Sequence, residues 1–328
     1  MDKLQCRRAA ALRTAAFLTV SLAASGPAFA SCGSAFCMVN TNWNVQGVWT
    51  EPGGKADLRY EYINQDQPMS GNRKVAVGEV PRDHDEVRTV NKNWIASVDY
   101  QFSPEWGLTA TAPVGNRDHV HIPSDEDPAT PETWRFTKLG DVRVLGRYQR
   151  MSEHADDQRM DFQGLNFGLK LPTGKTDVTN SAGSAAERTL QPGTGTTDAL
   201  FGGYFTRMLP GMDLTWFAQA LYQRPMNSHA DYKPGTRLSA DFGMRYDATP
   251  DLGLMVQLNL LHRGRDSGAQ AEPYDSGGRF VFASAGASYT LTRNLQVYGF
   301  VQLPLYQYVN GVQLTASKSL VVGVSSRF

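Results

Sequence analysis

This chain of 328 residues has no excess of charge of either sign, few cysteines and few long apolar runs. Its 32 basic side chains are matched by 32 acidic ones. A chain without excess positive charge is a poor match to a nucleic-acid partner, so none is expected. Beyond the first thirty residues no segment approaches 18 consecutive apolar residues, which argues against a transmembrane helix. What the chain does have is 31 glycines and 13 tyrosines, which favour strands and tight turns.

The N-terminus has the three parts of a secretory signal peptide. Four basic residues lie within the first thirteen positions, and the apolar stretch "TAAFLTVSLAA" that follows is too short to span a bilayer. Small residues in "AFA", at positions 28–30, supply a cleavage site. We therefore expect residues 1–30 to be removed and the mature chain to start near Ser31, outside the cytoplasm.

Only three cysteines are present, and Cys6 leaves with the signal peptide. Cys32 and Cys37 remain as a close pair in an oxidising compartment, where a disulfide is the default. A metal site and acylation of Cys32 are the open alternatives. Covalent haem would need a C-x-x-C-H motif, which is absent.

The mature chain repeats one pattern, a period-2 segment of about ten residues followed by a turn. In "NWIASVDYQF", for example, Trp94, Ala96 and Val98 lie on one face, and Ser97 and Asp99 lie on the other. The pattern predicts twelve strands near 57–64, 93–102, 106–113, 138–150, 162–172, 197–208, 212–223, 236–248, 252–263, 279–291, 294–305 and 315–328.

The connections between these strands alternate in length. "SPE", "LPG", "TPD" and "TRN" are short turns, whereas the connections in between are mostly long and polar, including 65–92, 114–137 and 173–196. Short periplasmic turns, long outer loops and an even strand count are typical of bacterial outer-membrane proteins. We expect an all-β fold, a transmembrane antiparallel β-barrel of about 12 strands over 57–328. Residues 31–56 would form a periplasmic or luminal segment before it.

The last strand, "LVVGVSSRF", ends in Phe328 and resembles the assembly signal of bacterial outer-membrane proteins. Ser326 stands where a hydrophobic residue is commoner. The expected partners are therefore outer-membrane lipid, the outer-membrane assembly machinery and a small-molecule solute. The sequence does not give the oligomeric state.

The polar faces of the strands would line the lumen. Opposite charges there either pair to hold the wall in shape or form a constriction that sorts solutes by charge. The candidates for selectivity are Arg143, Arg147, Arg237, Asp241 and Arg245. On the eleventh strand an inward-facing set could make an aromatic path: Tyr298, Phe300 and Tyr306.

The stretch "GLKLPTGKTD" ends like a phosphate-binding P-loop, but five residues rather than four separate Gly168 from Gly174. Pro172 also removes a backbone donor that the loop needs. Together with "LQPGTGTTDALFGGYF" the stretch instead resembles the strand–loop–strand signature of the phenol-degradation meta-pathway (MetA-type) family of outer-membrane transporters. The resemblance covers about forty residues. It implies a barrel that passes small, often aromatic or hydrophobic compounds, and no catalytic residues.

We accordingly expect a passive outer-membrane channel rather than an enzyme, with no cofactor and no bound metal. The alternatives are a structural or partner-binding barrel without flux and, less favoured, a barrel lipase or protease. His84, His119 and His121 fall in the expected outer loops, where the last two share a face with Asp118 nearby. Solvated loop histidines are the simpler interpretation of this group.

Overall fold

The computed structural model describes residues 31–32, 39–42, 46, 52–81, 84–123, 130–154 and 158–328. The signal peptide expected at 1–30 and Cys37 lie outside the described residues, as do the side chains of Cys32 and His84. The disulfide therefore stays a prediction.

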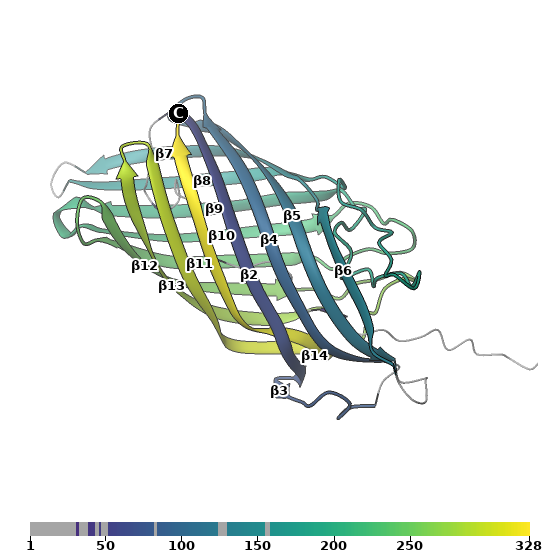
Figure 1. The fold of residues 1–328 in the computed structure, drawn as a ribbon. Coiled ribbons are helices and arrows are strands. Elements are labelled where there is room, and N and C mark those ends of the chain that lie inside the picture. Colours follow the sequence, from purple (N-terminus) through teal and green to yellow (C-terminus); the bar gives the residue numbers. More distant parts are fainter. Residues whose placement is uncertain are drawn as a thin grey trace, which may run out of the picture.

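Most of the described chain is β-structure, drawn in Figure 1 as one tube of strands. The strands are β1 Ser31–Cys32, β2 Gly53–Gly71, β3 Arg73–Lys74, β4 His84–Gln101, β5 Trp106–Pro123, β6 Glu132–Leu139, β7 Arg143–His154, β8 Arg159–Lys170, β9 Asp198–Leu209, β10 Leu214–Pro225, β11 Arg237–Asp247, β12 Leu252–Arg263, β13 Gly278–Thr292 and β14 Leu295–Arg327. One turn of 3₁₀-helix, η1 Pro210–Met212, joins β9 to β10. No helix among the described residues has the length and apolar character needed to cross a membrane.

Eleven of these strands close into an antiparallel barrel. The order runs β14–β13–β12–β11–β10–β9–β8–β7–β5–β4–β2, and β2 pairs again with β14. Strand β5 pairs with β7 along its first part and with the short β6 along its second part, so β6 and β7 together make one pass of the wall. The two-residue β3 pairs with the end of β2. Strand β1 pairs in parallel with β14 at Gln313 and Leu314.

Strand β14 makes two passes of the wall. It is antiparallel to both β13 and β2, yet the chain of antiparallel pairings makes β13 and β2 run in opposite directions. A straight strand cannot satisfy both neighbours, so β14 must reverse. The reversal lies at Asn310-Gly311, where Gly311 adopts a φ of 58°. The end of the strand therefore returns to its start, where the Arg327 N–H donates to the carbonyl of Asn294, the residue before β14, at 2.8 Å. The wall thus has twelve passes, which confirms the expected barrel.

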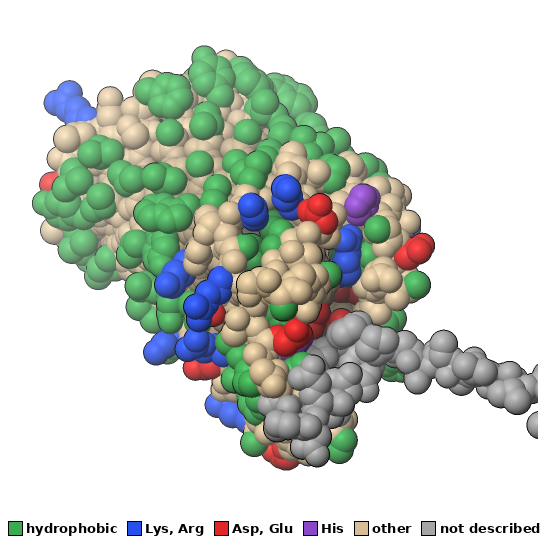
Figure 2. Space-filling model, turned by 45° about the vertical axis from the view of Figure 1, so that its right-hand side comes forward, with side chains coloured by type: hydrophobic (Ala, Val, Ile, Leu, Met, Phe, Trp, Pro, Cys, Tyr) green, Lys and Arg blue, Asp and Glu red, His purple; other side chains and the backbone are tan. Residues whose placement is uncertain are grey.

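The barrel is apolar outside and polar inside. Trp94, Val98 and Val256 are about half exposed, whereas inward-facing Asn91 and Asn259 are fully buried. Figure 2 shows the hydrophobic side chains spread over the wall of the barrel. An apolar surface this continuous is stable only against lipid, and it fits the band of an outer-membrane barrel.

One side of the barrel is taller than the other. Strands β2, β4 and β5 have 18 or 19 residues, against 11 or 12 in β8 to β12. The long strands extend together at the end opposite the C-terminus (Figure 1). The connections 65–92 and 114–137, expected as loops, are therefore largely strand. Polar residues on both faces hide the period-2 pattern once a strand leaves the lipid band.

The register of β14 shows that Tyr306 points outward, not into the lumen. Between the pairs Phe282–Pro304 and Val281–Tyr306 the register shifts, because Leu305 is an extra residue in β14. Such a bulge turns the following side chains to the opposite face. Tyr306 is accordingly 45% exposed on the outer surface, and the expectation that it points inward is wrong.

The first and last residues of the barrel close it. The Phe328 N–H donates to the Gly54 carbonyl at 3.0 Å, and the Gly54 N–H donates to the Phe328 carbonyl at 3.1 Å. A Cβ on Gly54 would come within 2.3 Å of the Phe328 ring, so the ring lies directly on the glycine backbone. This pair completes the seam at the end of the barrel that carries the short turns.

Candidate functional site

The loop between β8 and β9, residues 171–197, packs on the inner side of the tall wall. The Trp134 Nε1–H donates to the Ser184 carbonyl at 3.0 Å, and Arg117 donates to the carbonyls of Thr189 and Leu190. Leu190 is 1% exposed in a cluster with Trp134. The loop is therefore fixed by buried contacts at its tip.

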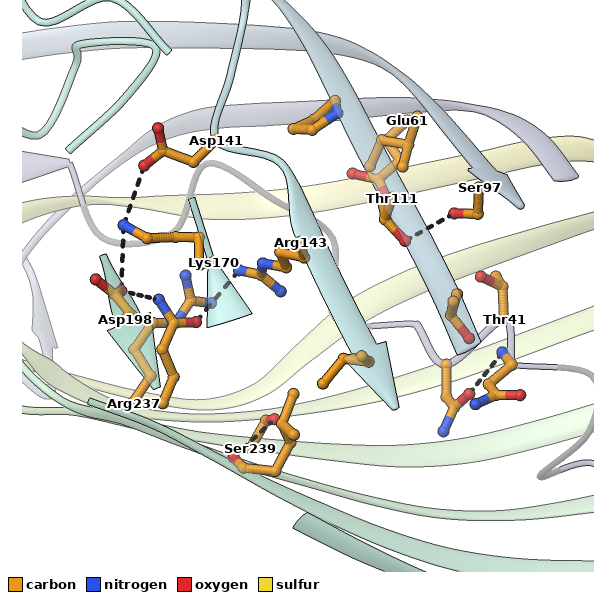
Figure 3. Close-up of a pocket in the computed structure, with 18 of the residues that line it drawn as sticks. Thr41, Glu61, Ser97, Thr111, Asp141, Arg143, Lys170, Asp198, Arg237 and Ser239 are labelled. Atoms are coloured by element: carbon orange, nitrogen blue, oxygen red, sulfur yellow. Dashed lines mark hydrogen bonds and ion pairs between the residues drawn. The ribbon is translucent and has the colours of Figure 1, made fainter. Parts of the chain in front are cut away.

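Asp141, in the break between β6 and β7, holds both ends of this loop. One carboxylate oxygen accepts from the Gly174 N–H at 3.0 Å. The other accepts from the Thr194 N–H at 3.0 Å and the Thr194 hydroxyl at 2.9 Å. Lys170 Nζ lies 3.0 Å from Asp141 and 3.2 Å from Asp198, so one ammonium is shared by two carboxylates. Figure 3 shows this chain of ion pairs.

Two glycines let the ends of the loop touch. A Cβ on Gly174 would stand 2.7 Å from the Gly193 Cα, and a Cβ on Gly193 would stand 2.4 Å from the Gly174 carbonyl oxygen. Backbones approach this closely only where both residues lack a side chain. This contact explains why the "PTGKTD" and "QPGTG" segments occur together. The glycines of these segments therefore serve the contact between the two ends of the loop, and no P-loop is needed to account for them.

A cavity of about 430 Å³ lies in the lumen beneath the loop. Its wall residues come from most strands of the barrel, and loop residues 188, 189 and 191–194 form part of its lining. Across β7 to β9, Arg143 pairs in register with Lys170, and Lys170 with Asp198. Across β10 to β12, Gln223 pairs with Arg237, and Arg237 with Arg263. Together these six residues form a polar rung that we call the cation rung.

Three of the five residues proposed for selectivity line the cavity: Arg143, Arg237 and Asp241. Figure 3 shows Arg143 and Arg237 reaching from β7 and β11 toward the Lys170–Asp198 pair. Asp241 accepts from the side-chain amide of Asn259 at 2.8 Å.

Arg147 and Arg245 do not line the cavity. Arg147 is 2% exposed and forms an ion pair with Asp99 at 2.8 Å. Arg245 donates to Asp247 at 2.7 Å and to the Ser288 hydroxyl at 3.0 Å. Both guanidinium groups lie nearer the short turns and stabilise the wall there.

The inward aromatic residues are packed rather than lining the cavity. Tyr298 and Phe300 are 5% and 1% exposed and form a cluster with Val39, Met255 and Val321. The Tyr298 hydroxyl donates to Asp57 at 2.8 Å. Their role as a path for solutes stays a prediction.

Part of the N-terminal segment contacts the same wall. The Asn40 N–H donates to Gln257 Oε1 at 2.9 Å, and Gln257 Nε2 donates back to the Asn40 carbonyl at 2.9 Å. Residues 39–42 line the cavity opposite the loop. Sequence patterns gave no sign of this contact, because residues 31–56 have no periodicity.

His119 and His121 lie in β5 and His84 is the first residue of β4, so none of the three lies in an outer loop. The side chains of His119 and His121 are buried. His119 Nδ1 is 2.8 Å from the Thr89 hydroxyl, and His121 Nε2 is 3.1 Å from a carboxylate oxygen of Glu132. The strand continues to Pro123 because β4 and β6 pair with it on both sides. Within the described ranges no group of three or more metal-ligating side chains could hold a metal ion.

The residues that sequence reasoning missed are Asp198, Thr194 and Arg188, all in or beside the loop. Arg188 donates to the carbonyls of Thr176 and Thr194 at 3.1 Å, and its guanidinium stacks over the Tyr232 ring at 4.9 Å. Burial, together with the adjacent Asp266 carboxylate, raises the pKa of the Tyr232 phenol above its usual value. Thr194 and Asp198 lie within the family signature "LQPGTGTTDALFGGYF", and this was the only feature of the sequence that could have pointed to them.

The chain resembles known outer-membrane channels in fold. The COG4313 outer membrane channel from Pseudomonas putida F1 aligns with a TM-score of 0.65 at 14% identity, over 85% of this chain and 96% of that one. The NanC porin (TM-score 0.42, 14% identity, 83% and 100% covered) and a mutant of the TodX monoaromatic hydrocarbon channel (0.45, 10%, 91% and 97%) are more distant. At these identities the likeness establishes the fold alone. A search of curated proteins finds no significant match.

The apolar belt and this fold make the protein an outer-membrane β-barrel. A family model described as the putative MetA-pathway of phenol degradation matches residues 130–310, which is more than half of the chain. The match includes the loop and the whole cation rung. The chain belongs to this family.

Proposed function

We propose that the protein is a passive outer-membrane channel for small molecules, including hydrophobic and aromatic ones. The observation that carries the proposal is the luminal cavity of about 430 Å³, enclosed by the barrel wall and the loop 171–197. Cavities of this size accommodate small organic molecules. The description of the family, which refers to phenol degradation, supports aromatic compounds as solutes.

The proposal assigns no catalytic step and no energy source to the chain, so solutes move down their gradient. The segment before β2 enters the lumen in this proposal, which the two bonds between Asn40 and Gln257 support. Residues 1–30 are removed on export. Outer-membrane lipid covers the apolar belt, and the assembly machinery recognises the last strand through Phe328.

The selectivity of the channel is assigned to Arg143, Arg237 and Asp241, which line the cavity. Arg147 and Arg245 are assigned a structural role, because Asp99 and Asp247 already neutralise them. Replacing Arg143 with Gln should therefore shift the reversal potential in a salt gradient. Replacing Arg147 should mainly lower stability.

The test is single-channel conductance of the mature protein, refolded and inserted into a planar bilayer. Steady ohmic steps are the expected result, together with swelling of liposomes in solutions of small solutes. Folding is checked first by the heat-dependent mobility of the barrel in gel electrophoresis. A correctly folded barrel that shows neither current nor swelling would instead favour a structural or partner-binding barrel.

A further inference from the structure

Most carboxylates around the cavity are held by basic partners, whereas Asp241 accepts from the neutral side chains of Asn259 and Asn40. Asp141 and Asp198 share Lys170 at 3.0 and 3.2 Å. Glu61 lies 3.0 Å from Arg59, and Asp266, which accepts from Tyr232, lies 2.7 Å from Arg263. These pairs cancel most of the charge on this part of the lumen.

Two guanidinium groups on the cavity have neutral partners instead. Arg143 donates to Gln223 Oε1 at 3.3 Å. Arg188 donates to backbone carbonyls and stacks on Tyr232. Among the residues that the structure describes, no carboxylate lies within 4.0 Å of either group. Eight basic side chains line the cavity against six acidic ones, so the lining has an excess of positive charge.

Two leucines, Leu145 and Leu221, lie beside the cation rung, and we call them the apolar rung, although polar Thr109 and Ser239 pair with them in register. Leu145 follows Arg143 by two residues on the inner face of β7, and Leu221 precedes Gln223 by two residues on the inner face of β10. Both leucines line the cavity, with Ile95 and Pro234. The cavity thus presents guanidinium groups at one level and aliphatic side chains at the next.

A guanidinium binds a carboxylate through two parallel charge-assisted hydrogen bonds, which are stronger in a lumen largely screened from bulk water. We propose that the cavity binds small organic carboxylates, with the carboxylate at Arg143 and an apolar body against Leu145 and Leu221. The inference rests on the proposed function, because it names a substrate class for the same lumen. Phenols and other neutral aromatics would bind to the apolar rung only.

The test is isothermal titration calorimetry of the refolded protein in detergent, with benzoate and benzyl alcohol as probes of similar size and shape. Benzoate should bind at least about 10-fold more tightly, and Arg143→Gln should weaken benzoate binding by about 10-fold to 100-fold while leaving benzyl alcohol unchanged. The matched control is Arg150→Gln, which removes a guanidinium from the outer face of the same strand, where it contacts Tyr148. Arg188→Gln gives a second variant in the loop, in case a change in β7 prevents folding.

Equal affinities for the two probes, no binding of benzoate, or full benzoate binding by Arg143→Gln would each overturn the inference. Liposome swelling with the same two solutes separates this result from the proposed function. Binding of benzoate without flux of either solute would uphold the site and refute the channel. Equal flux of both solutes with no benzoate binding would do the reverse.

Discussion

Replacing Asp141 with Asn should release the loop 171–197 without unfolding the barrel. Asn keeps the shape of the side chain but has one acceptor oxygen and one N–H₂ donor. In one orientation the amide N–H₂ faces the Gly174 N–H, and in the other it faces the Thr194 N–H and Lys170, so that donor meets donor. Each flip therefore loses at least one of the bonds that join the loop to the wall.

The magnitude follows from the partners that remain. Lys170 keeps Asp198 at 3.2 Å, so no buried charge is left alone and the full cost of breaking a buried pair does not apply. Weakening the charge-assisted bonds from Gly174 N–H, Thr194 N–H and Thr194 hydroxyl costs about 1 kcal/mol each, or about 3 kcal/mol in total. Local opening of the loop should then become about 100-fold more frequent, since 1.4 kcal/mol is about tenfold.

Limited trypsin digestion measures this opening, because Lys175 and Arg188 lie in the loop. Cleavage at these sites should accelerate by about 100-fold in Asp141→Asn when loop closure is fast relative to cleavage. Asp251→Asn, in an exposed turn at the other end of the barrel, is the matched control and should behave as the parent protein. Equal cleavage of the two variants would refute the role given to Asp141.

Two further substitutions test the same region. Gly174→Ala places a Cβ 2.7 Å from the Gly193 Cα and should destabilise the closed loop by about 1–3 kcal/mol, whereas Gly211→Ala meets open space and should have no effect. Trypsin digestion reads out both, and an unchanged rate for Gly174→Ala would contradict the close approach. Tyr232→Phe removes a hydrogen bond of 3.0 Å to Asp266 and should cost about 1 kcal/mol, seen as faster hydrogen exchange at the Gly235 amide. Because the pKa of Tyr232 is raised, its contribution is fully present below about pH 10 and declines as the pH rises above it. The ultraviolet titration of Tyr232→Phe should accordingly show one late-ionising tyrosine fewer than that of the parent protein.

The barrel could be predicted because its evidence is local. Most strands within the lipid band alternate apolar and polar residues, as in Leu252–Arg263, and short turns separate the strands. The extension of β4 and β5 beyond the band could not be predicted, since both faces there are polar and alternation disappears. The orientation of Tyr306 was missed because a single extra residue, Leu305, reverses the face without changing the composition.

The candidate site was harder to predict because it depends on contacts between distant segments. Arg143 and Arg147 are equivalent in sequence, being inward-facing arginines four residues apart on one strand. Only the folded chain places Asp99 beside Arg147 and neutral Gln223 beside Arg143. In the same way Asp141 is an ordinary polar residue until the loop folds back onto it.

The unequal height of the wall has a consequence for how solutes reach the lumen. A tube cut at an angle has a larger opening than the same tube cut square, and that opening faces sideways. Because β2, β4 and β5 rise above β8 to β12, the outer mouth of this barrel is tilted toward the low side (Figure 1). We expect a molecule that diffuses along the cell surface from that side to meet the rim before the wall, and one from the opposite side to meet the outer face of the tall strands first. On this expectation, the shape of the rim would favour the capture of solutes from one direction within the plane of the membrane.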